Sequence, residues 1–398
     1  MWPHFVFLAA VLLLLQTQLA AAANQTNTTN DVLLTSQLGP YPVTINSYEV
    51  KTNRTDPLAP THQLRNLVVT VYRPASKNLT CPTQDQDRIP YARPEVLKAL
   101  LGLLPSSGNS SSAANEDTAL LPALERVQIA NCTASDLSAS SKNPILLFGP
   151  GLRATHDVYT TITMASASFG YTVIAIDHTY ESAAVVFPDG SVNYTSPTTF
   201  KLIQEGHKGI ATIQDIRTAD VASVLDAMEK GQIPGLERGT NEKQIAMYGH
   251  SLGGSTATNA ALMDNRIKAS INLDGTFFGA PNETIVHKPL LMVGYPTDWP
   301  NFYANHDDGW KTWVQINNTE HYSYTDLPLI ADLLNLRGKA IPLSLTGTIN
   351  SQRLQAIISS YTNHFFDFFL RGEKTNFFQG PRANYPDVQF IAHSQPKD

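Results

Sequence analysis

The segment Gly249-His-Ser-Leu-Gly253 places a serine between two glycines at a spacing typical of a catalytic nucleophile. An apolar, strand-like run precedes it at 244–248, and small residues that suit a helix follow from Leu252. A strand that turns sharply into a helix crowds the positions two residues before and after the serine, so only glycine fits there. The turn strains and exposes the hydroxyl, and it aims free N–H groups at a developing oxyanion. We therefore predict that Ser251 is a nucleophile rather than a simple turn residue.

A serine hydroxyl is a poor nucleophile without a base that takes its proton. After this motif the expected chain order is serine, then acid, then histidine. His321 is the best-placed base, because its segment 317–322 follows the last expected core strand and can reach back over the strand ends. His306 is the competing candidate, and His364 falls inside the expected final helix, where a structural role is favoured.

The acid has two candidates that spacing alone does not separate. Asp274 ends the apolar run 269–274, the strand that follows the helix after the serine. Asp298 lies beyond the next strand, in the segment 295–299. Either carboxylate could orient the imidazole and stabilise its cation.

An oxyanion hole needs one N–H group from the residue after the nucleophile and a second from the loop after an earlier strand. Leu252 supplies the first of these. The loop Phe148–Arg153 is the candidate for the second, and its glycines allow close approach of the backbone. Leu152 is the expected donor in that loop, since Pro150 has no N–H group.

The same loop also fits a competing motif. Gly149-Pro-Gly-Leu-Arg-Ala154 matches G-x-G-x-x-A after a strand and before a helix, and Asp177 ends the following strand. This is the outline of a dinucleotide-binding fingerprint, which would indicate an oxidoreductase. That fingerprint normally opens the first strand–helix–strand unit of its domain, and it would leave Ser251 and its partners unexplained. We therefore expect no cofactor and no metal.

From residue 144 onward, strand patterns alternate with helix patterns, which predicts an α/β fold with parallel strands joined by crossover helices. The expected strands are 144–148, 171–177, 244–248, 269–274, 289–295 and 312–316. The expected helices are 158–169, 209–230, one that begins at Leu252, and 351–371.

The residues before 144 are less regular. Leu67–Tyr72 reads as a strand, and 94–105 has leucines and a valine at helical spacing. This helix could be a lid or a lipid-facing patch, but we favour a helix that packs on the core. A Ser-rich and Asn-rich linker follows at 106–115. We expect residues 24–142 to form an irregular N-terminal extension and residues 143–398 to form one compact catalytic core.

The first residues resemble a signal peptide. Phe5–Leu15 is an apolar run too short to span a bilayer, and small residues suited to cleavage follow at 20–23. We expect residues 1–23 to be removed and the protein to be secreted. Glycosylation sequons of the form Asn-x-Ser/Thr occur at Asn24, Asn27, Asn53, Asn78, Asn109, Asn131, Asn193, Asn282 and Asn317.

The chain contains only two cysteines, Cys81 and Cys132. In an oxidising compartment we expect them to pair, and buried free thiols are the alternative. Neither cysteine has the Cys/His spacing of a metal site.

The composition and charge of the chain limit the kinds of molecule that it is expected to bind. The chain has 398 residues, of which 42% are hydrophobic, and its formal net charge is −6 with no run of Lys or Arg. We therefore expect no nucleic-acid partner. A small ester or phospholipid substrate, and a lipid surface, remain as candidates, and the sequence indicates no obligate protein partner.

With these residues in view, the sequence resembles the secreted platelet-activating factor acetylhydrolases, the calcium-independent phospholipases A2 of the α/β-hydrolase superfamily. The resemblance covers roughly Pro144 to Asp326. It rests on Gly249–Gly254, Asn272–Gly275, Gly151-Leu152, Asp177-His178 and His321–Asp326, the last of which is similar to the family's H-x-x-[F/Y]-x-D segment.

The resemblance implies an α/β-hydrolase fold and a serine esterase that acts on short-acyl phospholipids. It further implies that Asp274 rather than Asp298 is the acid, and that Leu152 and Leu252 form the oxyanion hole. It leaves His178, His250 and Asp326 as structural residues.

This chain departs from the family in the oxyanion loop, where the usual His-Gly-Leu-Gly reads Gly149-Pro-Gly-Leu-Arg153. The substrate therefore carries over less well than the mechanism. A general esterase or cutinase-like polyester hydrolase is the alternative. A second alternative is a non-catalytic binding protein of the same fold.

Overall fold

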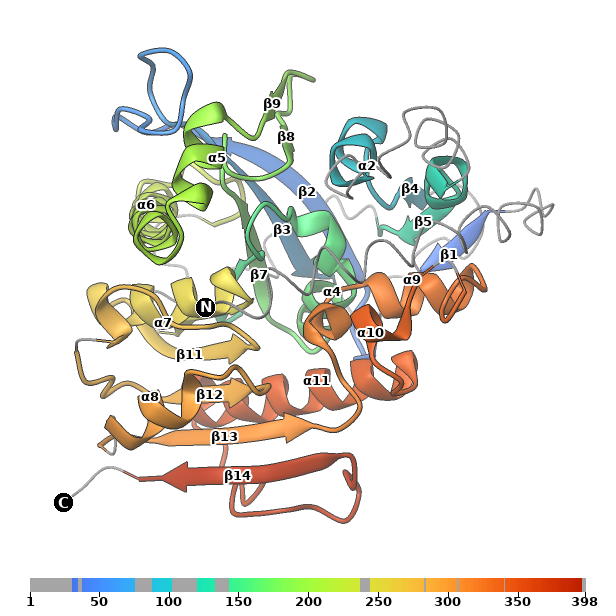
Figure 1. The fold of residues 1–398 in the computed structure, drawn as a ribbon, viewed down its shortest axis with the longest axis vertical. Helices are drawn as coiled ribbons and strands as arrows, with labels where there is room; N and C mark the ends of the chain where they lie inside the picture. The colour runs from blue at the N-terminus through green and yellow to red at the C-terminus, as the bar shows by residue number, and fades with distance from the viewer. Residues whose placement is uncertain are drawn as a thin grey trace.

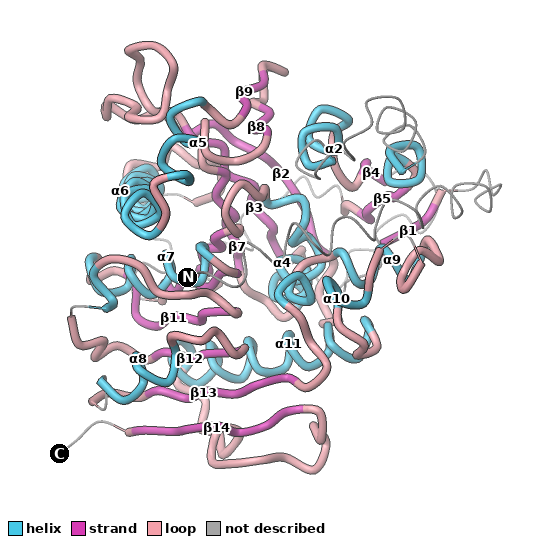
Figure 2. The backbone as a smooth tube through the Cα atoms, viewed as in Figure 1, coloured by secondary structure: helices cyan, strands magenta, loops and turns pink. Residues whose placement is uncertain are grey.

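The computed structural model describes residues 31–34, 38–75, 88–101, 120–132, 143–236, 244–282, 284–305, 308–339 and 341–395. One large sheet organises these residues, with helices packed on both of its faces (Figure 1). Helices alternate with strands along most of the chain, as Figure 2 shows.

The central sheet has nine strands in the order β14-β13-β12-β11-β10-β6-β7-β3-β2. The strands from β13 to β7 run parallel, and β14, β3 and β2 join the sheet antiparallel at its edges. Along the chain these strands are β2 (Val43–Val50), β3 (Leu67–Pro74), β6 (Ile145–Gly149), β7 (Thr172–Asp177), β10 (Ile245–His250), β11 (Ile267–Leu273), β12 (Leu290–Val293), β13 (Lys311–Ile316) and β14 (Val388–Ser394).

Helices cover the two faces of this sheet in two groups. The face with α4 (Thr160–Ser168) and α11 (Ser351–Phe366) lies opposite the face with α6 (His207–Glu229), α7 (Leu252–Met263) and α8 (Trp299–Asn305). In Figure 1, α6 and α7 appear on the left and α4 on the right. The central sheet and its helices are therefore layered helix, sheet, helix.

Strand β6 shows why the sequence folds this way. All five of its residues are buried, which is expected for a parallel strand covered on both faces. Leu146 and Phe148 pack in the core cluster that contains α4 and α11, whereas Ile145 and Leu147 pack in the cluster that contains α6 and α7. The continuous apolar run at 144–148 thus serves two cores at once.

The strand order reverses at β6. The chain passes from β6 to β7 on one side, and β10 then returns to pair with the other side of β6. The loops that follow β6 and β10 therefore leave the sheet in opposite directions at its carboxyl edge. Such a switch point opens a crevice where open α/β sheets bind their ligands.

The N-terminal residues contribute more to the core than we expected. Strands β2 and β3 lie within 24–142, yet they form the last two strands of the central sheet. β3 pairs with β7 through register pairs from Val68↔Asp177 to Tyr72↔Val173. The expected boundary at 143 is therefore wrong as a boundary of the core, because the sheet is completed by strands that precede it.

A smaller unit lies beside the sheet, on the right in Figure 1. It combines a short sheet in the order β1-β5-β4 with α2 (Pro94–Leu101). Its strands are β1 (Val32–Leu34), β4 (Arg88–Pro90) and β5 (Val127–Ala130). Val96 and Leu97 of α2 are 3% exposed and belong to the main core cluster, so the described part of this helix packs on the core.

The remaining elements are short and lie between the principal ones. They are η2 (His156–Tyr159), β8 (Ala184–Val186), β9 (Val192–Tyr194), α5 (Pro197–Gln204), η3 (Ala280–Asn282), η4 (His321–Tyr324), α9 (Leu327–Leu333), α10 (Leu343–Thr346) and the π-helical turn η5 (Asp367–Arg371).

Several expectations fall outside the described residues. These are the signal peptide at 1–23, the linker at 106–115 and Cys81. Cys132 is buried, and the described part of the chain contains no free cysteine. The Cys81–Cys132 pairing stays a prediction. No helix within the described ranges is long and apolar enough to cross a membrane.

Candidate active site

Ser251 lies at the sharp turn between β10 and α7. Its φ is 56°, which is a strained conformation for a residue with a side chain. A Cβ atom on Gly253 would lie 1.9 Å from the carbonyl oxygen of Gly149, and one on Gly249 would lie 2.5 Å from the same atom. The two glycines are therefore required because β6 and the first turn of α7 touch at this point.

His321 bridges Ser251 and Asp274. Its Nδ1 lies 2.7 Å from Oδ2 of Asp274, and its Nε2 lies 3.0 Å from Oγ of Ser251. An ionised carboxylate only accepts hydrogen bonds, so Nδ1–H donates to Asp274 and Nε2 accepts from the serine hydroxyl. The His321 side chain is 44% exposed, which leaves the imidazole accessible from solvent.

Backbone groups hold Asp274 and His321 in place. Asp274 follows β11 with a φ of 54°, and its second oxygen, Oδ1, accepts the N–H of Tyr295 at 3.0 Å. His321 opens the turn η4. A capping box fixes this turn, in which the N–H of Glu320 donates to Oγ of Ser323 at 2.7 Å.

The competing residues do not contact this constellation where they are described. Oδ2 of Asp298 accepts the N–H of Phe277 at 2.9 Å, and burial raises its pKa. His364 Nδ1 contacts the carbonyl of Ser360 inside α11. His306 lies outside the described residues. Of the two acids that spacing left open, the structure brings Asp274 to the imidazole.

His250, which we expected to be a packing neighbour, also makes polar contacts on both ring nitrogens. Its Nε2 lies 2.9 Å from the carbonyl oxygen of His321, and its Nδ1 lies 2.8 Å from Oη of Tyr159. Burial lowers the pKa of His250 well below its ordinary value, and the adjacent His321 acts in the same direction. The neutral ring therefore donates from Nε2 and accepts the tyrosine proton at Nδ1. It therefore holds the backbone carbonyl of His321 in place.

The two expected oxyanion donors belong to segments next to the serine, since a Cβ atom on Gly151 would lie 3.4 Å from Cβ of Ser251. Leu252 is the first residue of α7, and Leu152 lies in the loop after β6. In the described ranges neither N–H has a hydrogen-bond partner within the protein. Both side chains belong to an apolar cluster formed with α5, α6 and the segment after β11, whose other members are Leu202, Ile203, Ile210, Ala211, Ile213 and Phe278.

Asp177, the acidic residue of the dinucleotide-binding interpretation, is occupied by protein contacts. Both oxygens of Asp177 are used by His156, whose N–H donates to one at 2.8 Å and whose Nδ1 donates to the other at 2.6 Å. Burial by itself would lower the pKa of His156, but the charges of Asp157 and Asp177 outweigh it and raise that pKa to about 9. Asp177 therefore anchors the segment after the loop instead of facing a ribose.

His178 and Asp326 have the structural surroundings that the resemblance implies. His178 is fully buried and contacts Oδ2 of Asp220 at 2.8 Å. Asp326 is also fully buried, accepts the N–H of Thr161 at 3.0 Å and the hydroxyl of Tyr91 at 3.1 Å, and has its pKa raised by burial to about 6.

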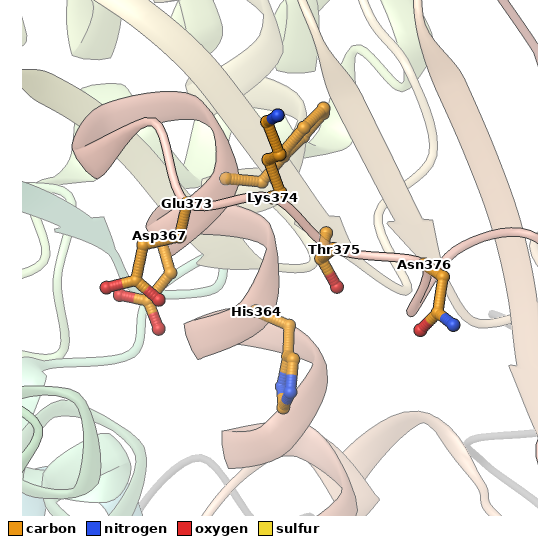
Figure 3. A pocket seen from close by; sticks show the side chains of 7 residues that line it. His364, Asp367, Glu373, Lys374, Thr375 and Asn376 are labelled. Carbon is orange, nitrogen blue, oxygen red and sulfur yellow. The ribbon is translucent and has the colours of Figure 1, made fainter.

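A cavity of about 470 Å³ lies elsewhere, at the C-terminal end of α11 (Figure 3). Its labelled lining residues are His364, Asp367, Glu373, Lys374, Thr375 and Asn376. It includes none of the residues that meet at Ser251. No group of His, Cys, Asp and Glu side chains in the described residues is arranged to hold a metal ion.

Known proteins resemble this chain over most of its length. The model of the family described as platelet-activating factor acetylhydrolase, isoform II, matches residues 26–199 and 198–376. A probable 1-alkyl-2-acetylglycerophosphocholine esterase from Arthroderma benhamiae is 28% identical over 82% of this chain and 86% of its own length. The platelet-activating factor acetylhydrolase of Bos taurus is 24% identical over 64% of this chain and 66% of its own length.

A solved structure has the same fold. The ferulic acid esterase from Streptomyces cinnamoneus superposes with a TM-score of 0.72 and 26% identity, over 91% of this chain and 100% of that one. The mixed sheet with flanking helices is thus that of an α/β-hydrolase. Each of these relatives is named as an esterase or acetylhydrolase, and the family model spans more than half of the chain. The chain therefore belongs to the platelet-activating factor acetylhydrolase, isoform II, family and is a carboxylic ester hydrolase.

Proposed function

We propose that this protein hydrolyses short-acyl esters through a triad of Ser251, His321 and Asp274. The observation that carries the proposal is the bridging imidazole, with contacts of 2.7 Å to the carboxylate and 3.0 Å to the hydroxyl. A nucleophile, a base and an orienting acid within hydrogen-bond reach are the arrangement that acyl transfer needs.

In the first half-reaction, Oγ of Ser251 attacks the ester carbonyl and His321 takes the hydroxyl proton at Nε2. Asp274 keeps Nδ1 protonated and stabilises the imidazolium. The imidazolium then donates the proton to the leaving alcohol, which departs and leaves an acyl group on the serine. A water molecule repeats the sequence, with His321 as base, and releases the acid.

The N–H groups of Leu152 and Leu252 stabilise the oxyanion of each tetrahedral intermediate. Both are backbone groups without a partner in the described structure, and Leu252 directly follows the serine in the chain. Removal of a single oxyanion donor typically lowers kcat by about 10²–10³-fold. Two fixed donors therefore account for a large share of the rate enhancement.

The favoured substrate is a phospholipid with a short acyl group, such as the 2-acetyl ester of platelet-activating factor. The names of the family and of the A. benhamiae relative support this choice. The alternative is a general or polyester esterase. The ferulic acid esterase favours it, because that enzyme has a similar fold at comparable identity.

A hydrolysis panel tests the proposal. It compares a 2-acetyl phospholipid, a long-chain phospholipid, p-nitrophenyl acetate, a feruloyl ester and a polyester film, with Ser251→Ala as the control. We expect the highest kcat/KM on the 2-acetyl phospholipid. Higher kcat/KM on the feruloyl ester, or turnover of the film, would favour the alternative. No hydrolysis by the folded protein would indicate a binding protein.

We further propose that the protein is secreted and glycosylated, with a Cys81–Cys132 disulfide. The apolar run Phe5–Leu15 and the sequons support this. The N-terminal sequence of the protein purified from culture medium, compared with residues 1–23, tests the first part. A decrease in mass on treatment with a glycosidase tests glycosylation, and the intact mass under non-reducing conditions tests the disulfide.

A further inference from the structure

The loop that carries Leu152 is held by a buried ion pair, Arg217 with Glu181. Both side chains are fully buried, and Nη2 of Arg217 lies 2.6 Å from Oε2 of Glu181. Arg217 lies on α6, and Glu181 lies in the segment after β7. Two charges without any solvent contact stay ionised in a protein interior only when they are paired and fully hydrogen-bonded.

The remaining donors of this pair are directed at the backbone of the loop. Nη1 of Arg217 donates to the carbonyl of Pro150 at 2.6 Å, and Nη2 donates to the carbonyl of Gly151 at 2.9 Å. Oε1 of Glu181 accepts the N–H of Arg153 at 2.7 Å. Nε of Arg217 also donates to Oε2 of Glu181 at 3.1 Å, so the guanidinium makes four hydrogen bonds, one more than the three donors of a lysine ammonium allow.

The other polar groups of the loop are also engaged. The N–H of Gly151 donates to Oη of Tyr159 at 3.1 Å, and the N–H of Ala154 donates to the carbonyl of Gly151 at 3.1 Å. Pro150 has no N–H. From Pro150 to Ala154, the N–H of Leu152 is thus the single one that the described contacts leave without a partner.

We propose that Arg217 and Glu181 are positioning residues that hold the oxyanion loop in the conformation that presents the Leu152 N–H to the reaction. The pair fixes the peptide groups before and after Leu152, so this N–H is oriented before substrate arrives. An oxyanion donor is effective in proportion to such preorganisation. α6 also packs Ile210 and Ile213 in the same apolar cluster as the Leu152 side chain, so one helix holds the loop by both its backbone and its side chain.

The expected effect on kcat rests on the proposed ester hydrolysis, whereas the expected effect on the conformation of the loop does not. The variants are Arg217→Met, which removes the donors and keeps most of the volume, and Glu181→Gln. Arg217→Lys keeps the charge without the fork. The matched control is Arg73→Met, because Arg73 is a buried arginine that donates to the carbonyl of Pro234. Arg73 follows Tyr72, whose register partner is Val173 near the amino end of β7. Ser251 follows the carboxyl end of β10, so the two residues lie at opposite ends of the parallel strands.

The first readout is kinetic. We expect Arg217→Met and Glu181→Gln to lower kcat on p-nitrophenyl acetate by about 10²-fold, the effect of one lost oxyanion donor, with little change in KM. Binding of a trifluoromethyl ketone, whose adduct with serine carries an oxyanion, should weaken in parallel. Arg217→Lys should stay impaired, and Arg73→Met should keep wild-type kcat for its folded fraction.

The second readout is amide hydrogen exchange of the peptide that covers 149–154, which needs no activity. We expect faster exchange in the Arg217 and Glu181 variants and unchanged exchange in Arg73→Met. Wild-type protection of this peptide together with wild-type kcat in Glu181→Gln or Arg217→Lys would overturn the inference, even if Arg217→Met does not fold. If the wild-type protein hydrolyses no ester, the proposed function fails while the exchange comparison still decides the positioning role.

Discussion

Replacement of Asp274 by asparagine separates the two candidate acids most sharply. The carboxylate makes two different contacts: Oδ1 accepts the N–H of Tyr295 at 3.0 Å, and Oδ2 accepts Nδ1–H of His321 at 2.7 Å. A backbone N–H can only donate, so the amide oxygen of the asparagine must remain at the Oδ1 position. The amide NH₂ group then faces the imidazole and donates to it.

That single exchange of oxygen for NH₂ selects the wrong tautomer of the base. With Nδ1 accepting from the amide, the proton of the neutral ring moves to Nε2, which can no longer accept the proton of Ser251. For triads of this type the loss is about 10⁴-fold in kcat, equivalent to roughly 5.4 kcal/mol of transition-state stabilisation. The fold should be nearly unchanged, because the new side chain has the same shape.

The matched variant is Asp298→Asn, because Oδ2 of Asp298 accepts the N–H of Phe277 and its carboxylate does not contact His321. We expect it to retain most of its kcat. The assay is kcat on p-nitrophenyl acetate for both variants, with the thermal midpoint as the control for folding. A crippled Asp298→Asn beside an active Asp274→Asn would refute the tautomer argument and the choice of acid.

Three further predictions address stability. Because the pKa of His156 is about 9 in the folded protein against an ordinary 6.5, its contribution is complete below pH 6.5 and is lost as the pH rises through 9. Urea unfolding should therefore show a decrease of up to about 3 kcal/mol across this window, and His156→Gln should flatten that slope. Tyr159→Phe leaves Nδ1 of His250 and one loop N–H without a partner, so the unfolding free energy should decrease by about 1–3 kcal/mol, whereas an unchanged value would mean that water replaces the hydroxyl. Gly253→Ala forces a Cβ atom against the carbonyl of Gly149, so we expect little soluble protein, and normal expression with a normal thermal midpoint would contradict the contact.

The parts of the fold that the sequence predicts best are those with one dominant pattern. The apolar run at 144–148 becomes β6, and the helical pattern at 209–230 becomes α6, each within a few residues. The sequence does not predict strand β14 or the place of β2 in the sheet. The exposure of β2 follows no clear period, and in β14 exposed positions do alternate, but the apolar Ile391 occupies an exposed position and the polar Ser394 a less exposed one. β14 is placed by pairing with β13, whose register partners lie 72–83 residues earlier in the chain, and β2 is placed through β3, whose partners in β7 lie 101–109 residues later. Local pattern contains no information about such pairings.

The candidate site also contains residues that the sequence predicts and residues that it does not. The two glycines beside Ser251 predict it as the nucleophile. Chain order and the family resemblance predict His321 and Asp274. Arg217 and Glu181 were not found, because a lone charged residue in a helix or loop normally lies in solvent, and only the packed structure shows that both are buried. The sequence predicts His250 only as a packing residue, since its position inside the motif gives no sign of the contacts to Tyr159 and His321.

If Ser251 is a nucleophile activated by His321, an electrophilic probe should label it covalently. The protein is treated with a fluorophosphonate, digested and analysed by mass spectrometry, beside His321→Ala and Ser251→Ala. We expect one adduct per chain on the peptide that contains Ser251, formed much more slowly in the histidine variant and absent in the serine variant. An adduct on a different residue, or no adduct on folded wild-type protein, would contradict it.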